Sequence, residues 1–558
     1  MTKARWVPIV VKAAVLLFAS SPLRAQETRA QTSLTAITPG SELDEYLRYL
    51  QTTGSVAPST WTLREYSTLR SARLLPVKAN PWAARFNPAP PAAAAHWTLF
   101  PVAIGSRVNS GFPFGGNDGA VWAGRGLTVH ANGGGMVRYG PFVLQLAPVV
   151  FWAQNASFPL QNNGQPGIGV FRSGLPQLAS AIDLPQRFGS GSYSRFDPGE
   201  SELRVETPWV MAGLSNAHRL WGPSSSFPFI LGRNAAGFEH IFVSTNQPLN
   251  LGFAKLTANV IYGRLSQSEY SPVTGPKEFF SIAEPGRQRF GAGVIAVLQP
   301  RGADGVEVGV SRFYHSLWPM SGIPRSYFTK PFQNFLKKSL AERNARSISD
   351  TEGSDNQLLA VFARWVLPHS GAEFYAEYGR DDHSYDFRDL ISEPDHTRSY
   401  MLGARKVMSQ DDRRLSAIRA EIINYQLPTT ARHRDEGGIY VHTLLRQGHT
   451  QRGQMLGAPL GPGASAGGIV AYDRFSTDGR FSITYTRTLN QEAGTFFSTG
   501  ITSPSAIDVT HALGVERLVF RGAVDFSYGL TFARNFNRNF GSDVMNLSAV
   551  AGARYNLR

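Results

Sequence analysis

The sequence predicts an all-β fold: a closed antiparallel outer-membrane β-barrel of about 18 strands, with a short N-terminal α-helical plug region. Three observations predict it. The chain begins with an export signal, and its 558 residues include only 17% charged residues and no Cys. Many segments of about ten residues alternate strictly between apolar and polar side chains, which is typical of membrane barrel strands. The lack of Cys also excludes disulfide scaffolds, thiolate metal sites and Cys nucleophiles.

Residues 1–25 predict a signal peptide. Three basic residues precede a short apolar core at residues 13–20, and residues 23–25 end in a small residue suited to cleavage. A membrane anchor would need about 20 apolar residues, so this stretch is too short to remain as one. We therefore expect export, with the cell outer membrane as the final location.

Residues 26–95 predict a helical preface followed by a Pro/Ala-rich linker. Ser41 can cap a helix with acidic residues in its favourable first turn. The apolar residues of this helix recur at helical spacing: Leu43, Tyr46, Leu47 and Leu50. A second helix is expected to begin at Ser59 or Thr60. The linker at residues 87–95 then leads into the first strand.

Residues 96–558 predict the transmembrane barrel. In residues 254–262, Ala, Leu, Val and Tyr share one face while Lys, Thr and Asn share the other. A soluble sandwich would also alternate, but full charges would be costly in its core and are hydrated in a barrel lumen. At roughly 25 residues per strand and connection, these residues supply about 18 strands. The charged residues expected to face the lumen are Glu307, Glu373, Glu377, Arg419, Arg517, Arg521 and Asp525.

The last strand, residues 546–557, resembles the C-terminal strand that outer-membrane insertion machinery recognises. Its apolar side chains alternate with polar ones up to Leu557. Arg558 follows at the position where a terminal aromatic residue is usual.

Six segments along the chain occur in a characteristic order. They are Asn117–Gly126, Arg138–Pro141, Trp221–Pro223, Arg312–His315, Ala363–Pro368 and Glu373–Asp382. Together they resemble the Wzi-type capsule assembly proteins, from the helices near residue 41 to about residue 445. Leu220 departs from the family pattern, which has a second Trp before Trp221 in many members.

The resemblance implies a plugged outer-membrane barrel that acts in capsule assembly, binding and anchoring capsular or exopolysaccharide at the cell surface without enzyme activity. The partners expected are this polysaccharide, outer-membrane lipid and lipopolysaccharide, and the barrel-insertion machinery. No cofactor and no metal is expected. Nucleic acid is not an expected partner, because the Lys and Arg residues are scattered and the chain is exported.

Aromatic and Arg side chains in Pro/Gly-rich connections are the candidate saccharide contacts. Flat aromatic rings can stack on the C–H faces of sugars, and guanidinium groups can bind acidic sugars. These candidates are Trp221, Arg219, Arg233, Trp318 and Arg325. The same side chains could equally be interface aromatics or loop packing.

A charged cluster on one predicted strand and its neighbours allows two interpretations. We interpret it as a lumen network of hydrogen bonds and ion pairs: Glu373, Glu377, Arg380, Asp381 and Arg419. It could instead be a general acid/base pair or a hard-cation site.

Two functions remain as alternatives to polysaccharide anchoring: a substrate-selective porin is the second candidate, and an outer-membrane hydrolase is the third. The hydrolase is poorly supported because no G-x-S-x-G surrounds residues 224–226.

Overall fold

The computed structural model describes residues 37–74, 76–86, 95–174, 182–273, 288–319, 322–333, 355–381, 384–428, 438–442, 445–491 and 507–557. The predicted signal peptide at residues 1–25 and most of the predicted linker, residues 87–94, lie outside the described residues.

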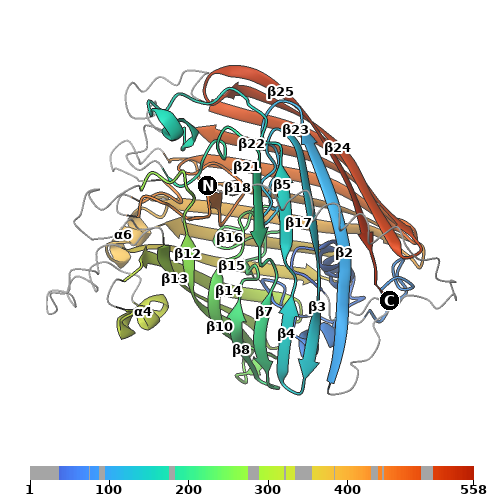
Figure 1. Ribbon diagram of the computed structural model, residues 1–558. Helices are drawn as coiled ribbons and strands as arrows, with labels where there is room; N and C mark the ends of the chain where they lie inside the picture. The colour runs from blue at the N-terminus through green and yellow to red at the C-terminus, as the bar shows by residue number, and fades with distance from the viewer. Residues whose placement is uncertain are drawn as a thin grey trace.

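Within the described residues, eighteen antiparallel strands close into one barrel (Figure 1). Its strand segments are β2 (Ala95–Asn109), β3 (Gly126–Tyr139), β4 (Phe142–Leu146), β5 (Val149–Ala153), β6 (Tyr193–Asp197), β7 (Glu202–Glu206), β8 (Val210–Ser215), β10 (Glu239–Thr245), β11 (Leu249–Asn250), β12 (Ala254–Ser266), β13 (Gln288–Pro300), β14 (Val306–Leu317), β15 (Asp355–Leu367), β16 (Ala372–Asp381), β17 (Arg398–Gln410), β18 (Arg414–Asn424), β21 (Ser465–Ser476), β22 (Gly479–Gln491), β23 (Ile507–Arg521), β24 (Val524–Arg538) and β25 (Ser542–Tyr555). Three strands are each interrupted into two segments: β4 with β5, β6 with β7, and β10 with β11. The predicted fold class is confirmed.

The barrel closes where its first and last strands meet. Residues 102–109 of β2 pair with residues 548–555 of β25, and the other edge of β2 pairs with β3. Hairpin turns at one end of the barrel are short, as between β23 and β24, whereas connections at the other end are long, as at residues 154–192. Outer-membrane barrels have short periplasmic turns and longer extracellular loops. We call these the short-turn end and the long-loop end.

Side chains along the strands alternate between the lumen and the outer surface. In β24, lumen-facing Asp525 is 2% exposed while its neighbour Phe526 is 44% exposed on the outer side. Lipid favours an apolar outer band flanked by aromatic girdles. Exposed aromatic residues lie at or near the short-turn end of the wall: Trp97, Tyr139, Trp209, Phe253 and Trp365. The outer wall therefore has the character of a lipid-facing surface.

The prediction that Arg517 and Arg521 face the lumen is wrong. The two-residue turn between β23 and β24 pairs Phe520 with lumen-facing Asp525. Directly paired residues lie on the same face of a sheet, so the two arginines fall on the outer face. The prediction continued the alternation of inward and outward side chains of β24 through the turn into β23. The turn instead shifts this alternation by one residue, so that even-numbered residues of β23 face the lumen. Arg517 lies at the rim, where it pairs with Asp478 at 2.8 Å.

Residues 37–74 and 76–86 lie inside the barrel, and we call them the N-terminal plug. The first predicted helix is confirmed as α2 (Glu42–Thr52), with the Ser41 hydroxyl accepting a hydrogen bond from the backbone N–H of Asp44 at 3.3 Å. The second predicted helix is wrong. Residues 63–64 form strand β1, and the short helix α3 (Thr68–Ala72) begins later. Pairing of β1 with β9 (Leu220–Trp221) inside the lumen outweighs the local helical pattern.

Two connections at the long-loop end also turn into the lumen. We call residues 216–238, 438–442 and 445–464 the loop insert. It contains β9 and a small hairpin of β19 (Thr450–Gln451) and β20 (Gln454–Met455). Among the described residues, no helix combines the length and the apolar character that a membrane crossing requires.

The lumen holds two main apolar cores. One joins the loop insert to the inner wall of β12 to β18, with Phe229 and Ile230 packed against wall residues such as Ile295. The other joins the N-terminal plug to β17, β18, β21 and β23, with Tyr46, Trp82 and Phe475 in ring contact. The inner face of β22 to β25 is less covered, since lumen-facing Glu516 on β23 keeps 54% of its side chain exposed.

Candidate functional site: the filled lumen and the long-loop mouth

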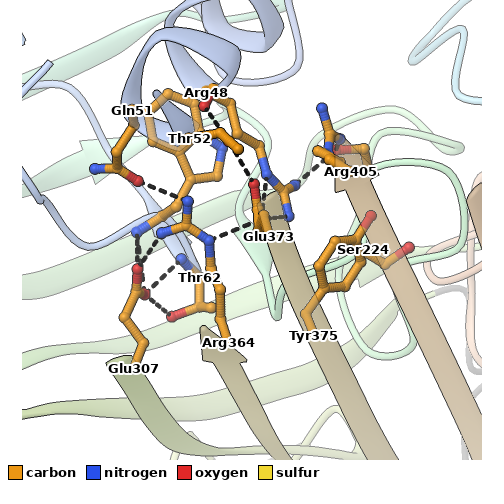
Figure 2. A network of polar contacts seen from close by, with 12 residues as sticks. Arg48, Gln51, Thr52, Thr62, Ser224, Glu307, Arg364, Glu373, Tyr375 and Arg405 are labelled. Carbon is orange, nitrogen blue, oxygen red and sulfur yellow. Dashed lines mark hydrogen bonds and ion pairs between the residues drawn. The ribbon is translucent and has the colours of Figure 1, made fainter. Parts of the chain in front are cut away.

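A buried ionic network fixes the N-terminal plug to the wall (Figure 2). Nε and Nη2 of Arg48, on α2, donate to Oε1 of Glu373 at 2.9 and 2.5 Å. Arg364, on the neighbouring strand, donates from Nε to the same oxygen at 2.8 Å and from Nη1 to Glu307 at 2.5 Å. The Thr62 hydroxyl of the plug donates to Glu307 at 2.7 Å. Each buried charge thus has an opposite charge within hydrogen-bond distance, as burial requires.

Ser225 of the loop insert links the two parts that fill the lumen. Its Oγ accepts hydrogen bonds from Arg48 at 3.0 Å and from Arg405 at 2.7 Å, and donates to Glu45 at 2.7 Å. These three bonds use the full capacity of a hydroxyl group. Burial alone would raise the pKa of the Glu45 carboxyl, but the charges of Arg405 and Arg48 hold that pKa well below its usual range.

The loop insert also donates three hydrogen bonds to Glu421 on β18. The Ser224 hydroxyl donates to Glu421 at 2.7 Å, and the backbone N–H groups of Ser225 and Ser226 donate at 3.0 and 2.8 Å. The Tyr375 hydroxyl adds a fourth bond at 2.7 Å. The run of three serines therefore positions the insert against the wall.

Further along the same stretch of wall, the plug contacts β21 and its neighbours. The Tyr49 hydroxyl donates to Asp473 at 2.8 Å, and Arg419 donates to the same carboxylate at 3.2 Å. Trp82 donates from its indole N–H to the Ser476 carbonyl at 3.1 Å. The plug is thus held along a continuous stretch of the wall from β14 to β21.

Three residues proposed for the lumen network lie inside the barrel. Glu373 and Arg419 take part in the contacts above. Asp381 accepts a hydrogen bond from the backbone N–H of Tyr440, in the loop insert, at 2.6 Å.

The other two residues of that group have different surroundings. Glu377 is buried beside Gly222, and neither of its carboxylate oxygens has a hydrogen-bond partner among the described residues. Arg380 lies on the outer face, because odd-numbered residues of β16 face the lumen, and its Nη1 contacts the Tyr378 hydroxyl at 3.5 Å. The placement of Arg380 in the lumen is therefore a wrong prediction.

The candidate saccharide residues divide between two places. Trp221, which is 1% exposed, and Arg219 are buried in the lumen, where Arg219 donates to Glu65 at 2.9 Å. Arg233 donates to the Gly40 carbonyl of the plug. In these positions Trp221 and Arg219 pack the interior rather than present a surface to a polymer.

Trp318 and Arg325 lie instead beside the outer wall. Trp318 packs near Phe290, with ring centroids 6.3 Å apart, and Phe290 is on the outer face of β13. Arg325 begins α4 (Arg325–Thr329) and is exposed. Neither residue belongs to the lumen.

An aromatic cluster at the long-loop end, partly exposed except for buried Phe188, was missed by sequence reasoning. It comprises Trp122, Phe171, Phe188, Tyr193 and Tyr270, of which Phe188 and Tyr193 stack at 4.4 Å and Phe171 meets Tyr270 at 5.9 Å. We call it the mouth cluster. Exposed or half-exposed amides lie in the same connection: Gln161, Asn162, Asn163 and Gln165. The charge-free stretch rich in Asn and Gln before residue 171 was the available signal.

Two kinds of group would indicate chemistry beyond binding in the described residues: a metal-binding cluster and a substrate-facing His. No group of three or more His, Asp or Glu side chains there is arranged to hold a metal ion. His449 is buried, its Nε2 lies 2.6 Å from the Ile230 carbonyl, and burial lowers its pKa to about 3. His449 is therefore neutral near pH 7 and has a packing environment rather than a substrate-facing one.

Comparisons with known proteins identify the fold. No protein-family model and no curated protein matches the chain. Among solved structures, Escherichia coli Wzi, an outer membrane protein involved in group 1 capsule assembly and a carbohydrate-binding β-barrel, has a TM-score of 0.57 at 13% identity. That match covers 93% of this chain and 99% of Wzi.

Two further structures are weaker matches. Pseudomonas aeruginosa OpdQ has a TM-score of 0.38 at 9% identity, covering 83% of this chain and 97% of OpdQ. Acinetobacter baumannii OccAB2 has a TM-score of 0.39 at 9% identity, and the match covers 82% of this chain and 98% of the OccAB2 chain. The match to Wzi, together with the closed sheet, shows that the chain has the fold of an outer-membrane β-barrel.

Proposed function

We propose that this protein binds and anchors capsular or exopolysaccharide at the cell surface, as a non-catalytic outer-membrane protein. The observation that carries the proposal is the mouth cluster with its neighbouring amides. Aromatic rings offer flat apolar faces for sugar C–H groups, and Asn and Gln offer both donors and acceptors for hydroxyl groups. The fold shared with Wzi along nearly the whole chain supports the same role.

The filled lumen supports anchoring over transport. The plug and the loop insert occupy the space beside β12 to β18 and β21, so a polymer chain has no wide path through that part of the barrel. A porin is the second candidate, favoured by the exposed lumen-facing Glu516. Planar-bilayer conductance of the purified protein separates the two, because an anchor should conduct ions weakly and a porin freely.

Retention of polymer in cells tests the proposal directly. Deleting the gene should release polysaccharide into the medium while total synthesis stays near normal. Sugar contacts are individually weak, so retention depends on several contacts acting on one long polymer. The double variant Phe171→Ala, Tyr270→Ala should therefore release part of the polymer.

A matched aromatic substitution provides the control. Tyr139→Ala removes an exposed ring at the short-turn end and should leave retention unchanged. If deletion leaves all polymer bound to cells, or if the purified protein shortens the polymer, anchoring is the wrong function.

A further inference from the structure

One long connection folds back onto the outside of the barrel. The segment of α4 and the 3-10 helix η3 (Lys330–Phe332) follows β14, and Tyr327 in it packs on Phe290 with ring centroids 5.0 Å apart. The Tyr262 hydroxyl on β12 donates to the Phe328 carbonyl at 2.7 Å, and Lys330 pairs with Asp355 at 2.5 Å. These wall residues face outward, so the segment covers the outer surface and not the mouth.

A second connection leans outward beside the first. It contains α6 (Phe387–Ser392), between β16 and β17. The hydroxyls of Tyr378 and Tyr400, both on the outer face, donate to Pro394 and Asp395 at 2.6 and 2.5 Å. Figure 1 shows α4 and α6 on the same side of the barrel at the long-loop end. We call residues 322–333 and 384–397 the collar.

The collar exposes large apolar side chains and two arginines, and its second segment also carries acidic residues. Phe332 and Phe387 are 62% and 64% exposed. Further exposed apolar residues are Ile323, Phe328 and Ile391. Arg325 and Arg388 are exposed in the same two segments. A group of large apolar residues of this kind is uncommon on a surface that meets only water and marks an interaction site.

We propose that the collar docks on the phosphorylated glycolipid of the outer leaflet. Its Phe and Ile side chains enter the boundary between acyl chains and headgroups, while Arg325 and Arg388 meet the phosphates. The contact is independent of polysaccharide binding at the mouth.

Two features select this occupant over a protein partner. The collar continues the lipid-facing wall, since the ring of Phe328 lies 5.1 Å from that of Tyr262 on the outer face. In the first segment, residues 322–333, the charged residues are Arg325 and Lys330, so this segment complements an anionic leaflet, to which each Lys or Arg near the surface adds measurable attraction. The second segment carries Asp386, Asp389, Glu393 and Asp395 beside Arg388, so the first segment supplies most of the attraction. Segments that combine apolar insertion with basic charge are typical of membrane interfaces.

Single-cysteine labelling tests apolar insertion, because the chain has no Cys of its own. Phe332→Cys and Phe387→Cys variants of the full chain, each with an environment-sensitive fluorophore, are placed in vesicles whose outer leaflet is lipopolysaccharide. Both labels should shift to shorter emission wavelength than a label at Gln165→Cys, an exposed amide in the β5–β6 connection. If all three labels report water, the collar does not dock on lipid.

Charge reversal tests the phosphate contact. Purified lipopolysaccharide should bind the double variant Arg325→Glu, Arg388→Glu more weakly than the unmodified protein, by about fivefold for each arginine. Dephosphorylated lipopolysaccharide should bind both proteins equally. Arg413→Glu, an exposed position at the short-turn end, is the matched control and should bind normally. Equal affinity of the double variant and the unmodified protein for phosphorylated lipid would overturn the proposal, provided that heat-modified gel mobility shows a closed barrel in both.

Discussion

The N-terminal plug and the loop insert share one lumen, and both pack apolar side chains on its wall, but they differ in the polar contacts that they add. The plug adds a buried ionic network, as between Arg48 and Glu373 at 2.5 Å, to its apolar core. The insert adds uncharged donors, such as the Ser224 hydroxyl that binds Glu421, to its apolar core around Phe229 and Ile230. The two parts touch at several points, among them Ser225 and the pairing of β1 with β9.

This difference predicts how the stability of each part responds to substitutions. A buried ion pair adds little net stability compared with apolar packing, yet removing one partner leaves the other charged and unpaired. An apolar core loses stability in proportion to the volume removed. The plug should therefore be sensitive to single charge deletions, and the insert to truncation of its packed side chains.

The largest effect is expected from Arg364→Ala. The substitution leaves the Glu307 and Glu373 carboxylates without the group that joins them, and should cost about 3–5 kcal/mol. Thermal unfolding should show the loss, and limited proteolysis should show cleavage within residues 37–86. Arg517→Ala is the matched control, since its partly exposed pair with Asp478 is worth about 0–1 kcal/mol. Equal effects of the two substitutions would contradict the buried-network account.

Truncating the insert should cost somewhat less and expose a different segment. Ile230→Ala removes a fully buried side chain from the apolar core and should destabilise the protein by about 2–4 kcal/mol. Proteolysis should then cut the loop insert and spare the N-terminal plug. Cleavage of the plug in this variant would mean that the two parts unfold as one unit.

Acid should weaken the insert first. The pKa of His449 is about 3 in the folded protein and near 6.5 when unfolded, so its stabilising contribution is complete above pH 6.5 and is lost as the pH falls. Between pH 6.5 and 4.5, the unmodified protein should lose about 1–2 kcal/mol more than His449→Gln. Parallel pH profiles of melting temperature for the two proteins would contradict this assignment.

The smallest effect concerns the plug at lower pH. The lowered pKa of Glu45 means that its contribution is present above about pH 4.5 and is lost as the pH falls further. Glu45→Gln should cost about 1–2 kcal/mol less at pH 3 than at pH 7, because at pH 3 the unfolded chain binds a proton that the folded carboxylate does not. Melting temperatures at both pH values provide the measurement. A cost of the substitution that is larger at pH 3 than at pH 7 would contradict the lowered pKa of Glu45.

Local patterns predicted the wall and the first helix well. Alternation placed Glu307, Glu373 and Asp525 on the inner face, because one buried or lipid-facing side specifies strand register strongly. The Ser41 cap identified the start of α2. The error at Arg517 came from a turn of two residues, which reverses the pattern without any change in composition.

The contents of the lumen could not be predicted in the same way. Nothing local distinguishes residues 216–238 from an extracellular loop, yet Trp221 pairs with Leu63 inside the barrel. Such contacts depend on segments far apart in the chain. Arg380 was assigned to the lumen for its charge, although the alternation of its strand sets it opposite Glu373 and Glu377, and it is buried on the outer side of the wall.

The plug imposes an order on assembly. Arg48 and Glu373 are 325 residues apart, and Tyr49 and Asp473 are 424 apart. Bringing such distant residues together carries a large loop-closure cost and slows folding. The plug is translated before every wall strand that it touches, so it must wait for its binding partners to be made. A chain arrested after β16 could form the contact of Arg48 with Glu373 but could not form that of Tyr49 with Asp473, and its barrel could not close on β25.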